Sequence, residues 1–247
     1  KLGWFIDHAE TVGERNLERI QALGGGVAIQ HRMAYQAEYF IRRYGKAAVQ
    51  ARPPLRTMLK MGLPIGGGTD GTRVASYHPW TCLWWLVTGK SVGGTVINDP
   101  QNRLSREEAL RLWTKGSAWF SGEDEIKGEL SVGQLADFAV LDNDYFSVDE
   151  DAIRGLESVL TVVDGKIVYA REEFAVHDPE LPPVSPDWSP VKQYGGYHNS
   201  HTHLLALEGR KQIMDQAEAE LALGRPDQAL AQLGPTPPAD EAPDRRR

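Results

Sequence analysis

The sequence predicts an α/β fold in which part of a parallel sheet with crossover helices is followed by a small antiparallel β unit. Two observations support the parallel sheet: short apolar segments alternate with helix-like segments along residues 2–70, and each apolar segment leads into polar side chains. One observation supports the antiparallel unit. Strand-like segments there are joined by Asp164-Gly165, a dipeptide that favours a tight hairpin turn.

Three strand-then-helix units make up the first part of the chain. Strands are predicted over 2–6, 27–29 and 61–65, and helices over 11–23 and, divided at Arg52-Pro53-Pro54, over 33–61. The strands lead into Asp7-His8, into Gln30-His31 and, through three glycines and Thr69, into Asp70. Because parallel strands end at a common edge, these polar side chains are expected at one rim.

The later part of the chain changes from helical to β character after Gly122. A helix is predicted after Pro79, and a capping box at Ser105–Glu108 opens another that runs to about Phe120. Strands are predicted over 128–130, 136–141, 158–163 and 166–169. We therefore expect three regions: 1–122 with the parallel sheet, 123–178 with the small β unit, and 179–247 with a proline-rich segment, two short helices (209–223 and 226–233) and a disordered end.

Composition excludes several classes of protein. The net charge of -7 argues against nucleic-acid binding, and no apolar run reaches membrane-spanning length. The single cysteine, Cys82, excludes an intramolecular disulfide, and we expect a buried thiol in a cytoplasmic protein. The chain begins with Lys1 and a core-like strand follows at once, so we expect it to be a fragment with sequence missing upstream. Three parallel strands cannot close a barrel by themselves.

Asp70 and His8 are the candidate chemical groups. An Asp after glycines is most often a turn residue or a helix cap, and a strand-end His is most often a satisfied structural residue. The recurrence of polar residues at the strand ends favours a functional role. Four further side chains near the same rim are candidate substrate contacts, although loop residues of these types are mostly solvated: Gln30, His31, Arg73 and His78.

Five motifs together resemble family 3 of the amidohydrolase superfamily, which includes proteins like N-substituted formamide deformylase. They are Ile6–Ala9, Gly68–Asp70, Leu104–Leu110, Lys127–Leu141 and Asp164–Tyr169. The resemblance covers roughly the first 170 to 190 residues and implies the C-terminal part of a (β/α)8 TIM-type barrel with a small antiparallel β-sandwich unit. His8 would lie on the sixth barrel strand and Asp70 at the end of the eighth. The family's metal-binding residues on earlier strands have no counterpart here and would lie upstream.

The resemblance also implies a chemistry: hydrolysis of an amide-like carbon–nitrogen bond with a divalent metal, zinc by preference, as one or two ions. Asp70 would contact the metal and move the proton of the attacking water, and His8 would bind a second metal or, with one metal, contact the water or the substrate carbonyl. The expected partners are a small-molecule amide-like substrate and either the missing N-terminal barrel strands or a second copy of the chain. We expect little activity from the isolated chain.

Two alternatives stay open. In the first, the chain is a non-catalytic module that binds a partner through its open sheet edge. In the second, it is a related hydrolase that acts on another substrate, such as a lactone. His201-Thr202-His203, close to His198, imitates a metal-binding pair, but it follows the small β unit in a polar segment, and we interpret it as unrelated to the catalytic site.

Overall fold

The computed structural model describes residues 3–71 and 74–180, together with Gln216 and Gln228. The chain divides into two compact units, Lys1–Pro183 and Val184–Arg247, and the first holds nearly all of the described residues. Apart from Gln216 and Gln228, the helices predicted over 209–223 and 226–233 lie outside the described part of the chain. The same holds for the disordered end, the histidines at 198, 201 and 203, and nearly all of the proline-rich segment.

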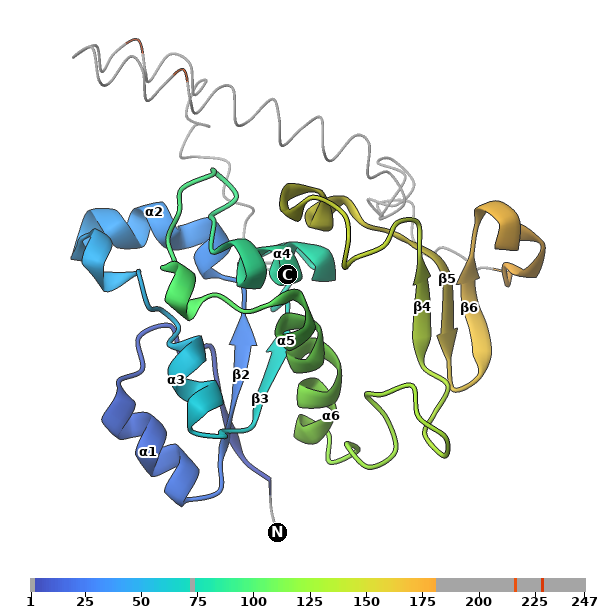
Figure 1. Ribbon diagram of the computed structural model, residues 1–247, viewed down its shortest axis with the longest axis horizontal. Coiled ribbons are helices and arrows are strands. Elements are labelled where there is room, and N and C mark those ends of the chain that lie inside the picture. Colours follow the sequence, from blue (N-terminus) through green and yellow to red (C-terminus); the bar gives the residue numbers. More distant parts are fainter. Residues whose placement is uncertain (1–2, 72–73, 181–215, 217–227, 229–247) are drawn as a thin grey trace, which may run out of the picture. The chain divides into compact units, whose positions relative to one another are not determined.

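Three parallel strands form the first sheet in the order β1-β2-β3 (Figure 1). The strands are β1 (Phe5–Asp7), β2 (Gly26–Gln30) and β3 (Ile65–Gly68). Helix α1 (Glu14–Ala22) connects β1 to β2, and α2 (Met33–Tyr44) and α3 (Leu55–Lys60) connect β2 to β3. The predicted alternation of strands and helices is thus confirmed.

The third strand lies later in the chain than predicted. Met61 caps α3, and Gly62 follows with a φ of 67°, so the chain is still turning over most of the segment 61–65. The strand begins at Ile65 and consists otherwise of the three glycines that follow the predicted strand.

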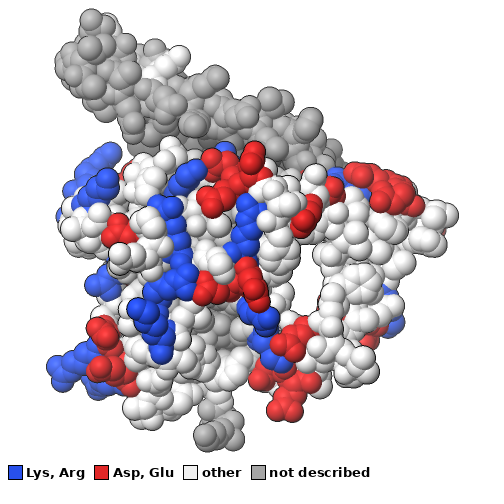
Figure 2. Space-filling view, in the orientation of Figure 1, with Lys and Arg blue, Asp and Glu red and all other residues white. Residues whose placement is uncertain are grey.

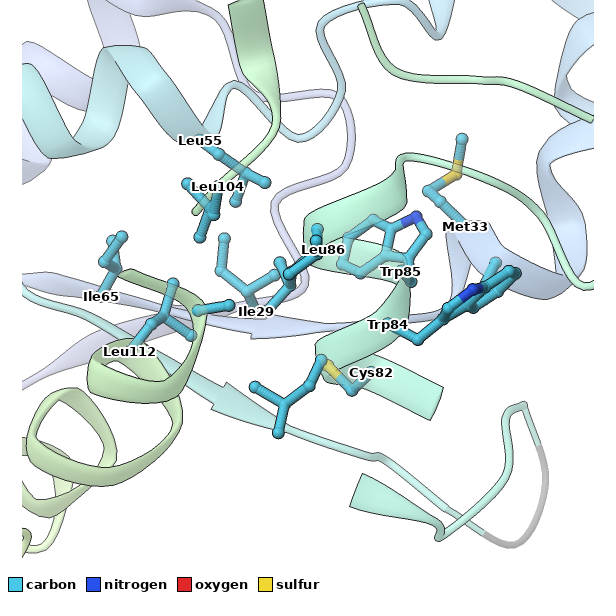
Figure 3. Packing of buried hydrophobic residues seen from close by; sticks show 14 of the residues in the cluster. Ile29, Met33, Leu55, Ile65, Cys82, Trp84, Trp85, Leu86, Leu104 and Leu112 are labelled. Atoms are coloured by element: carbon cyan, nitrogen blue, oxygen red, sulfur yellow. The ribbon is translucent and has the colours of Figure 1, made fainter. Parts of the chain in front are cut away.

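One face of this sheet packs into the main hydrophobic core. Val27 and Ile29 of β2 are completely buried, and they share one cluster with Leu17 of α1 and with Leu55 and Met58 of α3. Figure 3 shows Ile29 in this cluster together with residues from α3, α4 and the later helices. Burial of these side chains is the main favourable contribution to folding of this region.

The opposite face is lined by small residues and meets aromatic rings at the start of the strands. Parallel register places Phe5 beside Gly26. The Phe5 ring packs edge-on against Phe120, with 4.9 Å between ring centroids, and Trp119 and Phe120 lie directly over Gly26 and Gly66. The amino-terminal half of this face is therefore filled by aromatic side chains, and its carboxyl-terminal half carries Asp7 and Gln30.

The later helices confirm the predicted starts. Helix α4 is Pro79–Thr88, and α5 (Arg106–Arg111) opens with the predicted capping box, in which Ser105 and Glu108 bond each other's backbone N–H groups. A π-helical segment, Leu112–Gly116, joins α5 to α6 (Ser117–Phe120). An ideal Cβ on Gly116 would lie 2.2 Å from the carbonyl oxygen of Ile65, so only glycine allows this close approach to β3.

The second sheet is antiparallel, with order β4-β5-β6: β4 (Phe138–Leu141), β5 (Ser158–Val163) and β6 (Lys166–Ala170). Asp164 and Gly165 both have positive φ, as the predicted hairpin requires. The strand predicted over 128–130 is wrong, because Gly128 turns at a φ of 100° against Lys115 and the segment forms no ladder. A β-sandwich needs two packed sheets, and the described residues contain one antiparallel sheet, so the sandwich stays a prediction.

The main core also includes residues beyond the predicted boundary at 122. Tyr145, Ile153 and Leu156 are buried in the same cluster as the parallel sheet, and the indole N–H of Trp84 donates to Asp151 at 3.0 Å. The division at residue 122 stays a prediction. Within the described residues, no helix has the length and apolarity needed to cross a membrane.

Candidate functional site

The carboxyl ends of β1 and β3 bring His8 and Asp70 together. These residues follow the two outer strands of the sheet, yet Nε2 of His8 lies 3.9 Å from Oδ2 of Asp70. Their side chains are 36% and 45% exposed, so both groups are accessible from one rim. The structure thus places the two sequence candidates side by side, while their chemical roles stay predictions.

Both residues have backbone conformations that are uncommon for residues other than glycine. The φ angles are 76° at His8, 58° at Ala9 and 45° at Asp70, all in the left-handed region. The turn after β1 is held by the backbone N–H of His8, which donates to the carbonyl of Ala28 at 2.9 Å. Strained backbone is found preferentially at functional sites, and here it redirects an imidazole and a carboxylate toward each other.

Glu10 is a third acidic or basic group at this rim that the sequence analysis missed. Its Oε1 lies 3.8 Å from Nδ1 of His8, and both atoms are buried without a hydrogen-bond partner among the described residues. A carboxylate behind an imidazole orients the ring and raises its basicity, a common arrangement around metal-binding histidines. The signal in the sequence that could have indicated Glu10 is its closeness to His8, from which it is separated by Ala9 alone.

Gln30 lies at the carboxyl end of the central strand. Its Nε2 donates to Oδ1 of Asp7 at 3.2 Å. Gln30 and Asp7 lie on the same face of the parallel sheet, the face that Trp119 and Phe120 cover at the amino-terminal ends of the strands. The residue is 7% exposed, and its Oε1 is buried without a partner among the described residues. Gln30 thus presents an unused acceptor close to the rim, and substrate contact by this residue stays a prediction.

His31 is completely buried. Burial lowers its pKa to about 4, the backbone of Gly68 opposes this effect, and the nearby His78 adds to it. Its ring packs against Tyr35 with 5.6 Å between centroids, and neither ring nitrogen has a hydrogen-bond partner in the described structure. The imidazole is therefore neutral near pH 7, and its position fits a packing group between β2, α2 and β3 as well as the predicted substrate contact.

The other two predicted substrate contacts follow β3. His78 immediately precedes α4, and its backbone N–H donates to the hydroxyl of Ser76 at 3.1 Å. The effect of His78 on His31 places the two imidazoles in the same neighbourhood. Arg73 lies outside the described residues.

The donor set at the rim fits a zinc ion in part. Zn–N and Zn–O bonds are each roughly 2.0–2.2 Å long, so His8 and Asp70, 3.9 Å apart, would be close enough to hold one ion together. No group of three or more His, Cys, Asp or Glu side chains suited to a metal occurs in the described part of the chain. The pair His8 and Asp70 would therefore supply only some of the ligands of a four-coordinate ion.

The described residues define an α/β protein with an imidazole and a carboxylate at the carboxyl rim of a parallel sheet, the edge where ligands collect in such folds. Comparison with known proteins identifies the family: residues 2–169 match the amidohydrolase family Amidohydro_3. The match covers most of the chain, and the chain belongs to this family, as the sequence motifs had indicated.

Two curated relatives support the assignment. The amidohydrolase-like protein YtcJ of Bacillus subtilis (strain 168) is 29% identical over 168 residues, which are 66% of this chain and 31% of YtcJ. The N-substituted formamide deformylase of Arthrobacter pascens is 30% identical over 118 residues, 48% of this chain and 21% of that enzyme. The chain thus spans less than a third of the length of each relative.

Solved structures give the same fold. An uncharacterized metal-dependent hydrolase from Pyrococcus horikoshii OT3 is 26% identical with a TM-score of 0.51, covering 60% of this chain and 30% of that one. A mutant of atrazine chlorohydrolase TrzN from Arthrobacter aurescens TC1, complexed with zinc and atraton, is 20% identical with a TM-score of 0.50, covering 82% of this chain and 40% of that one. The α/β class with one parallel and one antiparallel sheet is confirmed.

Proposed function

We propose that this chain is the C-terminal part of a metal-dependent hydrolase that cleaves an amide-like carbon–nitrogen bond in a small molecule. The observation that carries the proposal is the 3.9 Å separation of His8 Nε2 and Asp70 Oδ2 at the exits of two parallel strands. Family membership and the similarity to a formamide deformylase support the choice of bond. We call the polypeptide that includes the remaining barrel strands the complete protein.

The residues of this chain have distinct roles in the proposed reaction. A bound divalent ion such as zinc would lower the pKa of water towards 7 and so supply hydroxide at neutral pH. His8 would hold the ion or, in a one-metal site, contact the water or the substrate carbonyl, and Glu10 would orient its ring. Asp70 accepts the proton of the attacking water and returns it to the leaving nitrogen, for which its exposed carboxylate is suitably placed.

The remaining metal ligands must come from outside the described residues. Because His8 and Asp70 are two donors and the described chain shows no third in a metal-binding arrangement, the proposal requires further barrel strands or a second copy of the chain. The similarity to a metal-dependent hydrolase of about twice the length, of which the match covers 30% against 60% of this chain, supports further barrel strands as the source.

The decisive variant is Asp70→Asn in the complete protein. It keeps the size of the side chain but removes the proton acceptor, so amide hydrolysis should fall by a factor of at least about 100. Glu18→Gln, an exposed carboxyl change on α1, is the matched control and should leave turnover unchanged. Turnover retained by Asp70→Asn would overturn the assignment of Asp70.

A second candidate function is partner binding through the edge of β1, which we propose because this edge differs from the other edge of the sheet. The hydroxyl of Ser117 bonds both the N–H and the C=O of Gly67, at 3.0 and 2.9 Å, and so occupies the free edge of β3. In the described sheet, β1 pairs only with β2, and its Phe5 and Ile6 are 41% and 45% exposed. An open apolar edge of this kind favours addition of another strand.

Light scattering distinguishes this alternative. A chain that pairs with itself through β1 should be larger than a monomer, and Ile6→Lys should shift it to the monomer, because a charged side chain blocks edge pairing. A monomer at all concentrations would exclude self-pairing. Neither the hydrolase nor the partner-binding hypothesis favours nucleic acid as a partner. Acidic and basic side chains lie interspersed on the face shown in Figure 2, and the net charge is -7.

A further inference from the structure

Asp7 has a carboxylate at the rim that the proposed reaction does not use. It is the last residue of β1 and directly precedes His8, and its side chain lies on the same sheet face as Gln30. Asp7 is exposed, and its Oδ1 accepts from Nε2 of Gln30 at 3.2 Å. Among the described residues, no Lys, Arg or His side chain pairs with Asp7, and its second oxygen accepts no hydrogen bond. This oxygen is therefore available to a donor from outside the described chain.

Gln30 presents a second acceptor without a donor. Its side chain is 7% exposed, and its Oε1 is buried without a partner in the described structure. The bond to Asp7 fixes which end of the amide group is the donor, so the unpartnered atom is the oxygen. A buried acceptor that lacks a donor costs free energy, and a ligand that brings a donor to this place would recover it.

The sheet surface is open beside these two groups. Parallel register places Gly68 of β3 next to Gln30. A Cβ on Gly68 would meet no atom of the described structure within 4 Å, so the face has free space at this point. Gly68 lies two residues before Asp70, and Asp7 directly precedes His8. The open space thus adjoins the candidate pair whose side chains are 3.9 Å apart.

We propose that Asp7 binds a positively charged amino group of the substrate and that Gln30 positions the Asp7 carboxylate for this contact. The inference rests on the proposed function, because it assigns the substrate class of the same site: a small amide that carries a primary ammonium group. The two unused atoms are both acceptors, and an ammonium group has only donors. A carboxylate also binds a charged donor more strongly than a neutral one. A short spacer in the substrate leaves the amide end near His8 and Asp70.

Binding can be measured on the full 247-residue chain without any hydrolysis. The probes are N-(2-aminoethyl)acetamide, called the amine probe, and N-propylacetamide. They have the same amide group and similar length, and they differ in an ammonium group against a methyl group. The titration is followed by NMR of the isotope-labelled chain at about 0.15 M salt, which screens nonspecific attraction of cations.

The amine probe should shift the backbone signals of Asp7 and Gln30 and bind at least about threefold more tightly than N-propylacetamide. Equal binding of the two probes, or shifts that leave the signals of Asp7 and Gln30 unchanged, would overturn the proposal.

Asp7→Asn tests the charged contact. The variant keeps an acceptor for Gln30 and removes the charge, so it should weaken binding of the amine probe at least about threefold. Asp149→Asn is the matched control, because it removes the same charge from an exposed residue whose side chain caps no helix. An equal loss in both variants would show nonspecific attraction and contradict the proposal.

Gln30→Met tests the positioning role without a change of charge. Methionine has a similar length but no donor for Asp7, so the preference for the amine probe over N-propylacetamide should fall. This ratio does not follow a general loss of stability, and an unchanged ratio would exclude positioning by Gln30. In the complete protein, binding of the amine probe at Asp7 without hydrolysis would remove only the hydrolase proposal. Equal kcat/KM values for the two amides would remove only the present inference.

Discussion

The hydroxyl of Ser117 replaces a neighbouring strand for Gly67. It accepts from the Gly67 N–H at 3.0 Å and donates to the Gly67 carbonyl at 2.9 Å, and it can reach both groups because the π-helical segment brings Gly116 against Ile65. One side chain thus satisfies two backbone groups at the edge of the sheet, where an unsatisfied polar group would be costly.

Ser117→Ala should therefore destabilise the chain by about 1–3 kcal/mol, because two half-buried backbone groups lose their partner. Urea denaturation measures this change. Ser121→Ala is the control, since Ser121 bonds the Ala118 carbonyl from an exposed position at the end of α6, and it should cost no more than about 0.5 kcal/mol. Equal effects would show that Ser117 does not support the β3 edge.

Two glycines of β3 should differ in their tolerance of alanine. A Cβ on Gly66 would lie 2.6 Å from the Phe120 ring and 3.0 Å from the Cα of Ser117, whereas a Cβ on Gly68 would meet nothing within 4 Å. Gly66→Ala should cost about 1–3 kcal/mol through overpacking. Gly68→Ala should change the free energy of unfolding by less than about 1 kcal/mol. The reverse order would contradict the packing of α6 on this sheet.

His31 should make stability depend on pH. Its pKa falls from 6.5 to about 4 on folding, chiefly through burial, so the unfolded chain binds more protons between these values. Stability should therefore decrease as the pH falls from about 6.5 to 4, by at most about 3 kcal/mol. Denaturation curves of His31→Leu should lack this part of the pH dependence, and those of His177→Gln, an exposed histidine, should keep it. Identical pH dependence in the wild type and His31→Leu would exclude a neutral buried imidazole.

Glu10 should support metal binding through His8. Loss of a carboxylate behind a ligating histidine weakens metal binding by roughly 10- to 100-fold, and the 3.8 Å approach of Glu10 Oε1 to His8 Nδ1 predicts that Glu10→Gln has such an effect on zinc affinity in the complete protein. Isothermal titration measures it, with Glu14→Gln in the exposed first turn of α1 as the control. Equal affinities would mean that Glu10 is only a turn residue.

The sequence was most informative where local chemistry and strand polarity agree. Asp70 and His8 could be predicted at one rim because parallel strands end together, and the hairpin at Asp164-Gly165 follows from turn chemistry alone. Glu10 could not be placed, since its position depends on the left-handed backbone at His8 and Ala9. The strand at 128–130 was predicted from the β character of the chain after Gly122, but Gly128 turns the chain there. The burial of His31 could not be predicted, because its surroundings include Gly68 of β3, which lies far away in the sequence.

The most direct test of the central claim is anomalous diffraction at the zinc edge from crystals of the complete protein grown with zinc. We expect a peak within roughly 2.0–2.2 Å of a carboxylate oxygen of Asp70, with the imidazole of His8 bound to the same or an adjacent ion or, in a one-metal site, facing it across the bound water. Stoichiometric zinc held elsewhere, with Asp70 making no contact to it, would exclude Asp70 and His8 as the metal site.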